Sequence, residues 1–201
     1  MKVVIGTSKD DMARKAAAAA AAAIRNALAR QGSCRMIVAT GASQFEFLGY
    51  LTSAPDIDWS RVTGFHLDEY AGLPATHKAS FRGYLRKRFA GAVPVPLKAF
   101  NEVNGEAADP AAECRRLKAL LDAAPIDLAC VGIGENGHLA FNDPPADFET
   151  EEAYTVVNLD QVCRHQQVGE GWFATMDDVP RQAFSRSEEH TSELQSLTDI
   201  S

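Results

Sequence analysis

The chain has 201 residues, of which 46% are hydrophobic and 23% are charged, as in one globular domain large enough to bury a core. Its formal net charge of −7 argues against nucleic acid or an anionic membrane surface as a partner, because both require a basic face. No apolar run is long enough to predict a membrane-spanning helix.

Short apolar runs alternate with helical stretches along the chain. Strands are predicted at residues 3–6, 36–40, 62–67, 126–132 and 154–159, and helices at residues 10–30, 43–54, 80–90 and 109–124. Ser8 and Asp11 resemble a capping box at the start of the first helix. Asp109 is the predicted N-cap of the last helix, with Pro110 at its first position, N1. The alternation predicts right-handed βαβ crossovers and therefore a single-domain α/β fold, Rossmann-like, with a mainly parallel sheet and helices on both faces.

Two features indicate a cytoplasmic protein. The alanine run at residues 16–23 is preceded by Asp10 and Asp11 and followed by Arg25, which favours an amphipathic helix over a signal peptide. The four cysteines show no metal-type spacing, and we expect them to be reduced structural thiols. They are Cys34, Cys114, Cys130 and Cys163.

The end of the chain departs from this pattern. The polar stretch from Arg186 to Ser196 resembles the translation of a DNA-sequencing adapter and has no clear helix or strand period. We therefore predict a domain at residues 1–185 and a non-native tail at residues 186–201. The alternative is a native, charged C-terminal tail.

The segment at residues 132–144, GIGENGHLAFNDP, carries the strongest chemical signal. It follows a predicted buried strand, and its three leading glycines allow a sharp turn at the strand end, where open α/β sheets bind ligands. The turn contains Asn136, His138, Asn142 and Asp143. A tight strand-to-helix turn with a surface histidine would explain the glycines alone, but the ordered string favours an active site.

Two further blocks follow predicted strands. Residues 65–74 read FHLDEYAGLP, which places Asp68 at a strand end, either as a functional carboxylate or as the N-cap of the next turn. Gly41, Ala42, Ser43 and Gln44 join a strand to a helix start, where backbone N–H groups and the helix dipole can bind an anion. An ordinary βα turn fits this last block nearly as well.

Together and in this order, the three blocks resemble the signature of the glucosamine-6-phosphate deaminase/isomerase family, whose relatives include the 6-phosphogluconolactonases. The resemblance covers residues 2–185. It implies conversion of glucosamine 6-phosphate to fructose 6-phosphate and ammonia, without cofactor or metal, on a small-molecule sugar phosphate. It is also compatible with a homo-oligomer of the full-length protein. Family members carry further strands beyond the equivalent of Ser185, so we expect the C-terminal part of the sheet to be missing and the 201-residue chain to be inactive.

The resemblance also implies roles for individual residues. Asp68 corresponds to the base that moves a proton between C2 and C1, and His138 to the histidine that opens the sugar ring. Asn136 and Asp143 stand where the family has an aspartate and a glutamate. An asparagine can orient the imidazole but cannot stabilise an imidazolium by charge, and Asp143 reaches one methylene less far. The turn at residues 41–44 would bind the substrate phosphate.

Other departures leave alternatives open. The family has an arginine, before an aromatic pair, that binds phosphate or substrate, whereas residues 169–173 here contain none. A non-catalytic sugar-phosphate regulator is therefore one alternative. A 6-phosphogluconolactonase is another, although the sequence after His138 differs from the Ser-Leu-Phe-Pro type typical of lactonases. His66, His77 and His138 are too scattered to predict a metal site.

Overall fold

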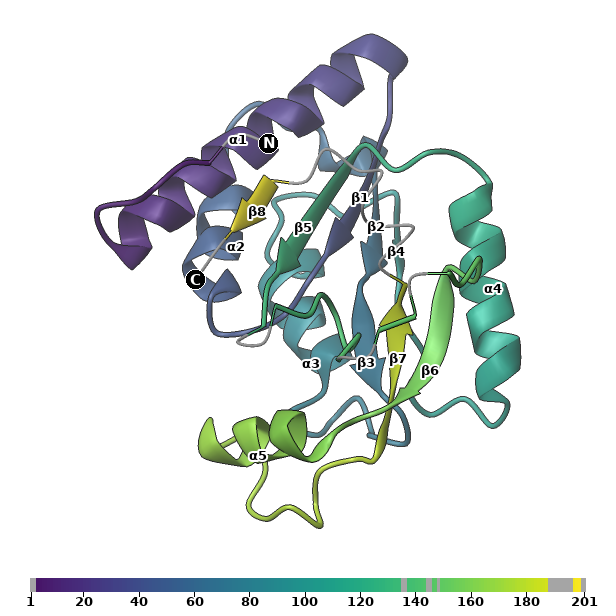
Figure 1. Cartoon of the computed structure of the whole chain (residues 1–201). Helices are drawn as coiled ribbons and strands as arrows, with labels where there is room; N and C mark the ends of the chain where they lie inside the picture. The colour runs from purple at the N-terminus through teal and green to yellow at the C-terminus, as the bar shows by residue number, and fades with distance from the viewer. Residues whose placement is uncertain (1–2, 135–136, 144–145, 148, 188–196, 200–201) are drawn as a thin grey trace.

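The main sheet of the computed structural model has five parallel strands in the order β4–β2–β1–β5–β8 (Figure 1). The structure describes residues 3–134, 137–143, 146–147, 149–187 and 197–199. The strands are β1 (Cys34–Val38), β2 (Val62–His66), β4 (Ala99–Asn101), β5 (Leu128–Gly132) and β8 (Leu197–Asp199). This confirms the predicted α/β class, although the short edge strands β4 and β8 were not predicted.

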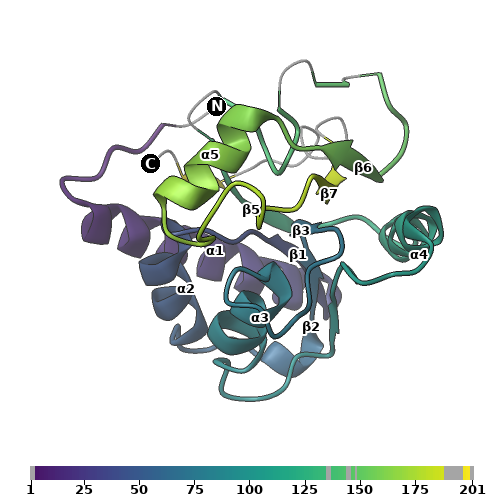
Figure 2. The same ribbon diagram turned by 90° about the horizontal axis from the view of Figure 1, so that it is seen from below.

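Helices cover both faces of this sheet, as predicted (Figure 2). One face carries α1 (Lys9–Gln31), α2 (Gln44–Thr52) and α3 (Phe81–Leu85), the last continued by the π-helical turn η2 (Arg86–Ala90). The other face carries α4 (Pro110–Asp122). A short 3-10 turn, η1 (Trp59–Arg61), leads into β2.

Strand β1 shows why the sheet is buried on both sides. Met36 and Val38 pack in the core beneath α1 and α2, whereas Ile37 packs in the core beneath α4. All three side chains are fully buried. A strand that buries alternate residues in two cores is nearly continuously apolar, as residues 36–38 are.

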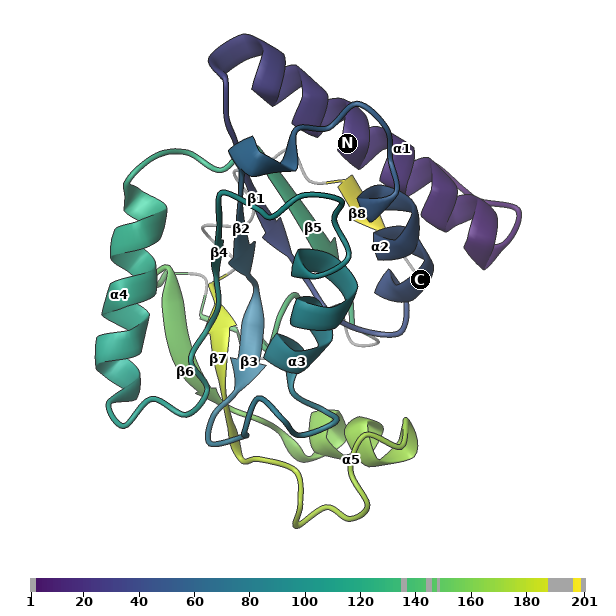
Figure 3. The ribbon, with the colours of Figure 1, turned by 180° about the vertical axis from the view of Figure 1, so that it is seen from behind.

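A second, antiparallel sheet lies at the carboxyl ends of the main strands (Figure 3). It consists of β3 (Asp68–Tyr70), β7 (Gln182–Arg186) and β6 (Tyr154–Asn158), in that order. Helix α5 (Gln161–Gly169) packs against this sheet. The expectation that residues 154–159 continue the parallel series was therefore wrong. The middle residues of β6 are only partly buried, as is typical of an antiparallel strand with one solvated face.

Residues 3–6 form no strand, contrary to prediction. Val3, Val4 and Ile5 are 60%, 54% and 83% exposed and pair with no strand among the described residues. The segment leads instead to the N-terminus of α1, where Ser8 is the N-cap and its hydroxyl accepts from the Asp11 N–H at 3.1 Å. The predicted caps of α1 by Ser8 and of α4 by Asp109 are confirmed.

The fold continues past Ser185. Strand β7 ends at the buried Arg186, and the Ser187 N–H donates to the Ala153 carbonyl at 3.2 Å. Strand β8 pairs in parallel with β5, with Leu197 opposite Cys130. A non-native origin of residues 186–201 stays a prediction.

A buried carboxylate joins β3 to the start of α3. Glu69 has no exposed surface, and its Oε1 accepts from the backbone N–H groups of Tyr70 at 2.9 Å and Phe81 at 3.1 Å. Its Oε2 accepts from the Ser80 hydroxyl at 2.9 Å and from the Arg82 N–H at 2.8 Å. Burial raises the pKa of Glu69, and hydrogen bonds from these donors oppose the rise, so the network favours the ionised carboxylate at a helix N-terminus.

The Arg82 guanidinium completes this network and is itself buried. It lies 3.4 Å from the Glu69 Oε2 and donates to the Leu73 carbonyl at 2.9 Å and to Glu106 at 3.0 Å. The segment between β3 and α3 is therefore fixed at both ends.

We expect Glu69→Ala to cost about 3–5 kcal/mol of the free energy of unfolding, because it removes the buried carboxylate from Arg82, which keeps only the half-exposed Glu106, and leaves buried N–H donors unpaired. Urea denaturation measures this loss. Glu102→Ala is the control, since Glu102 pairs with the exposed Arg86 at 2.6 Å, and such a pair contributes about 0–1 kcal/mol. Equal losses in the two variants would contradict the role given to Glu69.

Candidate active site

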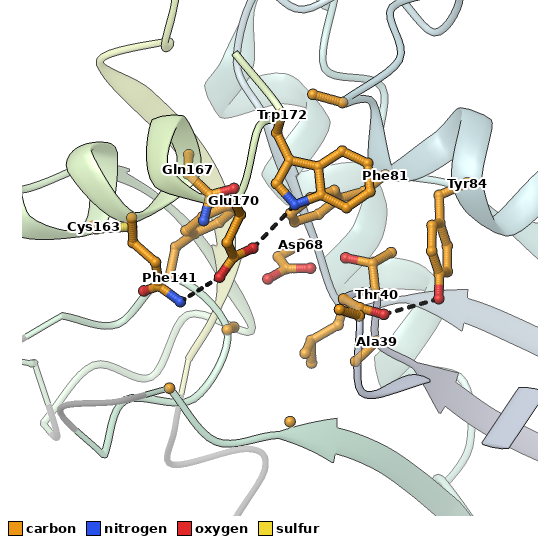
Figure 4. Close-up of a pocket in the computed structure, with 18 of the residues that line it drawn as sticks. Ala39, Thr40, Asp68, Phe81, Tyr84, Phe141, Cys163, Gln167, Glu170 and Trp172 are labelled. Atoms are coloured by element: carbon orange, nitrogen blue, oxygen red, sulfur yellow. Dashed lines mark hydrogen bonds between the residues drawn. The ribbon is translucent and has the colours of Figure 1, made fainter. Parts of the chain in front are cut away.

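A cavity of about 510 Å³ opens at the carboxyl ends of β1, β2 and β5 (Figure 4). Its wall comes from the segments that follow these three strands, from the start of α3, and from α5 with the loop after it. Open α/β sheets bind ligands at this edge. Asp68 and His138 both line the cavity, which is the juxtaposition expected from their positions after separate strands.

Asp68 is a buried acid that faces this cavity (Figure 4). Its residue surface is 6% exposed, and its Oδ1 has no hydrogen-bond partner among the residues that the structure describes. Burial, and then the negative charge of Glu69, raise the pKa of Asp68 to about 8. A carboxyl group with such a pKa exchanges protons with a carbon acid far more effectively than an ordinary surface aspartate.

His138 is oriented by Asp143. The His138 Nδ1 lies 3.0 Å from the Asp143 Oδ1, and both side chains are mostly buried. His138 lines the cavity, whereas Asp143 is not a lining residue and contacts the imidazole through its Nδ1. The shorter aspartate therefore still reaches the histidine, and it favours the tautomer with a proton on Nδ1.

Two glycines shape the turn before His138. The Gly134 N–H donates to the His138 carbonyl at 2.9 Å, and a Cβ on Gly134 would come within 2.3 Å of the imidazole ring. Gly137 adopts a φ of +86°, which side chains with a Cβ rarely adopt. Asn136 lies outside the described residues.

The loop after His138 is attached to β7, a contact that the sequence analysis missed. The Ser185 hydroxyl accepts from the Phe141 N–H at 3.0 Å and donates to the Asn142 side-chain oxygen at 3.0 Å. Asn142 in turn donates to the Arg186 carbonyl at 2.6 Å. No local sequence signal marks this interaction, because it joins positions more than 40 residues apart.

The turn between β1 and α2 lies on the same cavity. Gly41, Ala42 and Ser43 line it, whereas Gln44 is buried beside Gly132 and is not a lining residue. The Ser43 hydroxyl makes no capping hydrogen bond to α2. Within the described part of the chain, the N–H groups of Ala42 and Ser43 have no acceptor.

Two side chains hold the carbonyl groups of this turn, Tyr84 from the cavity wall and Lys9 from outside it. The Tyr84 hydroxyl donates to the Gly41 carbonyl at 3.0 Å, and burial raises the pKa of Tyr84, so the phenol keeps its proton. The Lys9 ammonium donates to the Ala42 carbonyl at 3.3 Å. With the carbonyls occupied, the remaining donors of the turn are suited to an anion at the N-terminus of α2.

The outer rim of the cavity comes from α5 and the loop after it, which the sequence analysis did not assign to the site. The Glu170 carboxylate accepts from the Trp172 indole N–H at 3.0 Å and from the Gln166 amide at 2.7 Å (Figure 4). The Lys78 ammonium reaches this rim from the β3–α3 segment and donates to the Gly171 carbonyl at 2.8 Å. Lys78 is the only lysine or arginine among the described lining residues.

An aromatic cluster supports the rim from below. The Tyr70 ring lies 5.0 Å from that of Phe81, 5.2 Å from that of Phe141 and 5.5 Å from that of Phe173. The Tyr70 hydroxyl donates to Gln167 of α5 at 2.7 Å. These contacts bring α5 against the strand that carries Asp68.

The described part of the chain offers neither a metal site nor a membrane-spanning helix. No three His, Cys, Asp or Glu side chains there are grouped so that they could hold a metal ion. None of the helices there is both long and apolar enough to cross a membrane.

Comparisons with known proteins agree with this arrangement. The model of the family "Glucosamine-6-phosphate isomerases/6-phosphogluconolactonase" matches residues 7–167. A glucosamine-6-phosphate deaminase of Lysinibacillus sphaericus is 34% identical over 79% of this chain and 68% of its own length. One from Shouchella clausii is 38% identical over 63% of this chain and 50% of its own length. The chain thus spans between half and about two thirds of these relatives.

Solved structures give the same result. A monomeric glucosamine-6-phosphate deaminase superposes with a TM-score of 0.89 at 27% identity, covering 98% of this chain and 81% of that one. A 6-phosphogluconolactonase from Shewanella baltica superposes with a TM-score of 0.72 at 17% identity, covering 94% of this chain and 75% of that one, and shows the fold alone. The matched family model, the sequence relatives and the shared architecture together establish that this chain belongs to the family of glucosamine-6-phosphate isomerases and 6-phosphogluconolactonases.

Proposed function

We propose that the protein converts glucosamine 6-phosphate and water to fructose 6-phosphate and ammonia. The observation that carries this proposal is one cavity containing a carboxyl group of raised pKa, Asp68, and a carboxylate-oriented imidazole, His138. An aldose–ketose isomerisation needs such a pair, since each of its steps before ammonia release is a proton transfer. The relatives named above as deaminases support the same substrate.

The residues divide the reaction between them. His138 takes the proton of the anomeric hydroxyl and returns one to the ring oxygen, which opens the pyranose to the aldehyde. Ionised Asp68 then removes the proton from C2 while the ammonium group at C2 gives a proton to the aldehyde oxygen, which yields an enolamine with a hydroxyl group at C1. Protonated Asp68 next delivers its proton to C1, which leaves an iminium at C2 and regenerates the carboxylate. Water adds to this carbon, and the C–N bond breaks to give the ketone and ammonia. Asp143 holds the imidazole throughout. The family resemblance implies the same orienting role for Asn136, which lies outside the described residues.

The β1–α2 turn would bind the substrate phosphate through its free N–H groups and the Ser43 hydroxyl. Lys78 would add a positive charge at the rim. Gln44, which the sequence placed in this site, would support the turn from the core rather than touch the ligand.

A cytoplasmic location, a small-molecule sugar phosphate as the partner, and a homo-oligomer in the full-length protein belong to the same proposal. The net charge of −7 supports the absence of a nucleic-acid or membrane partner. The four cysteines are buried thiols, which fits a reducing compartment.

Two assays separate this proposal from its alternatives. Ammonia release from glucosamine 6-phosphate is expected from a deaminase and from neither a lactonase nor a non-catalytic regulator. Hydrolysis of 6-phosphogluconolactone without ammonia release would favour the lactonase, for which the fold is the only support here.

Asp68→Asn in the full-length protein should slow the exchange of the C2 hydrogen with solvent by ~10²–10⁴-fold while leaving substrate affinity nearly unchanged. An amide keeps the shape of the side chain but cannot accept the proton. Deuterium incorporation, followed by NMR, measures the exchange. Asp58→Asn is the control, because Asp58 is exposed, caps the short turn η1 and does not line the cavity. Exchange at the wild-type rate in Asp68→Asn would refute the role of base.

The raised pKa of Asp68 also predicts opposite pH dependences for activity and stability. Activity that requires the ionised base should rise as the pH rises through about 8. Stability should fall between the ordinary value of 3.8 and about 8, because over this range the folded state holds a proton that the unfolded state releases.

Between pH 5 and 8 the wild type should lose up to about 1.4 kcal/mol of its free energy of unfolding per pH unit through Asp68, and Asp68→Asn should not lose it. The stability of the variant relative to the wild type should therefore increase from pH 5 to 8 and then level off. Urea denaturation at one-unit pH intervals measures the difference. A constant difference across this range would show that Asp68 ionises normally in the folded state.

A further inference from the structure

The charges around the cavity do not match those that the family resemblance implies. Where the family has a substrate-binding arginine before its aromatic pair, this chain has Gly169, Glu170 and Gly171 before Trp172. The structure brings this stretch to the cavity rim, with the Glu170 side chain among the lining residues. The position thus carries a negative charge instead of a positive one.

Glu170 is an ionised and oriented group. Its two observed partners, the Trp172 indole N–H and the Gln166 amide N–H, can only donate, so both carboxyl oxygens act as acceptors. The two contacts come from either side of the carboxylate and turn it toward the cavity (Figure 4). The residue is otherwise exposed, which leaves lone pairs free for a ligand.

The other acidic groups on the cavity wall are uncharged at neutral pH. Asp68 has a pKa of about 8, raised first by burial. The Cys163 thiol has a pKa of about 12, also raised first by burial. Glu170 is therefore the fixed negative charge among the described lining residues.

We propose that Glu170 binds the ammonium group at C2 of the substrate and selects amino-sugar phosphates over their hydroxyl analogues. This inference rests on the proposed deaminase function and adds a specificity-determining residue to it. The substrate carries a phosphate and an ammonium group, which need opposite partners. The β1–α2 turn offers donors to the phosphate, and Glu170 offers a carboxylate to the amine. Trp172, held by Glu170, adds an aromatic surface beside the same cation.

Binding of two unreactive ligands to the full-length protein tests this inference. 2-Amino-2-deoxyglucitol 6-phosphate and glucitol 6-phosphate differ only in the group at C2, and neither has a carbonyl that could react. We expect the amino ligand to bind about tenfold more tightly to the wild type in calorimetric titrations at low salt. In Glu170→Gln the ratio should fall to about one, because the amide still accepts from the indole but carries no charge.

Two further variants separate charge from structure. Asp177→Asn removes the same charge from an exposed position in the same loop, which is not a lining residue, and should leave the ratio unchanged. Glu170→Ala releases Trp172 and should weaken both ligands while also abolishing the preference.

A wild-type protein that binds the two ligands equally, or a preference that survives Glu170→Gln, would overturn the inference. Either result with normal ammonia release leaves the deaminase function intact. Conversely, an amine preference that depends on Glu170 in a protein that releases no ammonia would support amine recognition and contradict the proposed reaction.

Discussion

The active-site side of this protein depends on one buried ionic interaction, that of Glu69 with the N-terminus of α3 and with Arg82. A fully buried carboxylate is costly unless donors surround it, and here backbone N–H groups, a hydroxyl and a guanidinium do so. The network fixes β3, which carries Asp68, relative to the segment that brings Lys78 to the rim. Glu69 also raises the pKa of Asp68 through its charge, after the larger effect of burial. The same residue thus positions Asp68, the proposed base, and adjusts its proton affinity.

The antiparallel sheet performs the second task, which is to bring His138 toward Asp68. Strand β7 pairs with β3 on one side, and its Ser185 hydroxyl contacts the loop that carries His138 and Asp143. Asp68 and Ser185 are themselves paired across the two strands. Proton transfer at adjacent carbons requires the acid–base groups to be held at a defined separation, and a sheet pair supplies such rigidity better than two independent loops. The antiparallel sheet in this sense supports the proposed catalytic pair, Asp68 and His138.

The cavity combines groups whose charges are set by different environments. Asp68 is buried and mostly protonated near neutral pH, whereas Glu170 is exposed and receives hydrogen bonds from Gln166 and Trp172. Two acidic side chains on one cavity can therefore serve two purposes, one as a proton carrier and one as a fixed charge. On the opposite wall, the β1–α2 turn offers backbone donors without a neighbouring acceptor. The distribution fits a substrate that carries charges of both signs.

The sequence by itself determined the α/β class, the two helix caps and the placement of Asp68, His138 and the β1–α2 turn at strand ends, because these depend on local periodicity and on turn residues. Only the tertiary structure decided the antiparallel sheet, the attachment of the His138 loop to Ser185, and the presence of Glu170 on the cavity rim. Residues 3–6 show the limit of prediction from local pattern, since their apolar residues suit a strand but no strand among the described residues pairs with them. Strand pairing and buried charge networks join positions far apart in the chain, and their energies depend on burial and on partners that no local pattern contains.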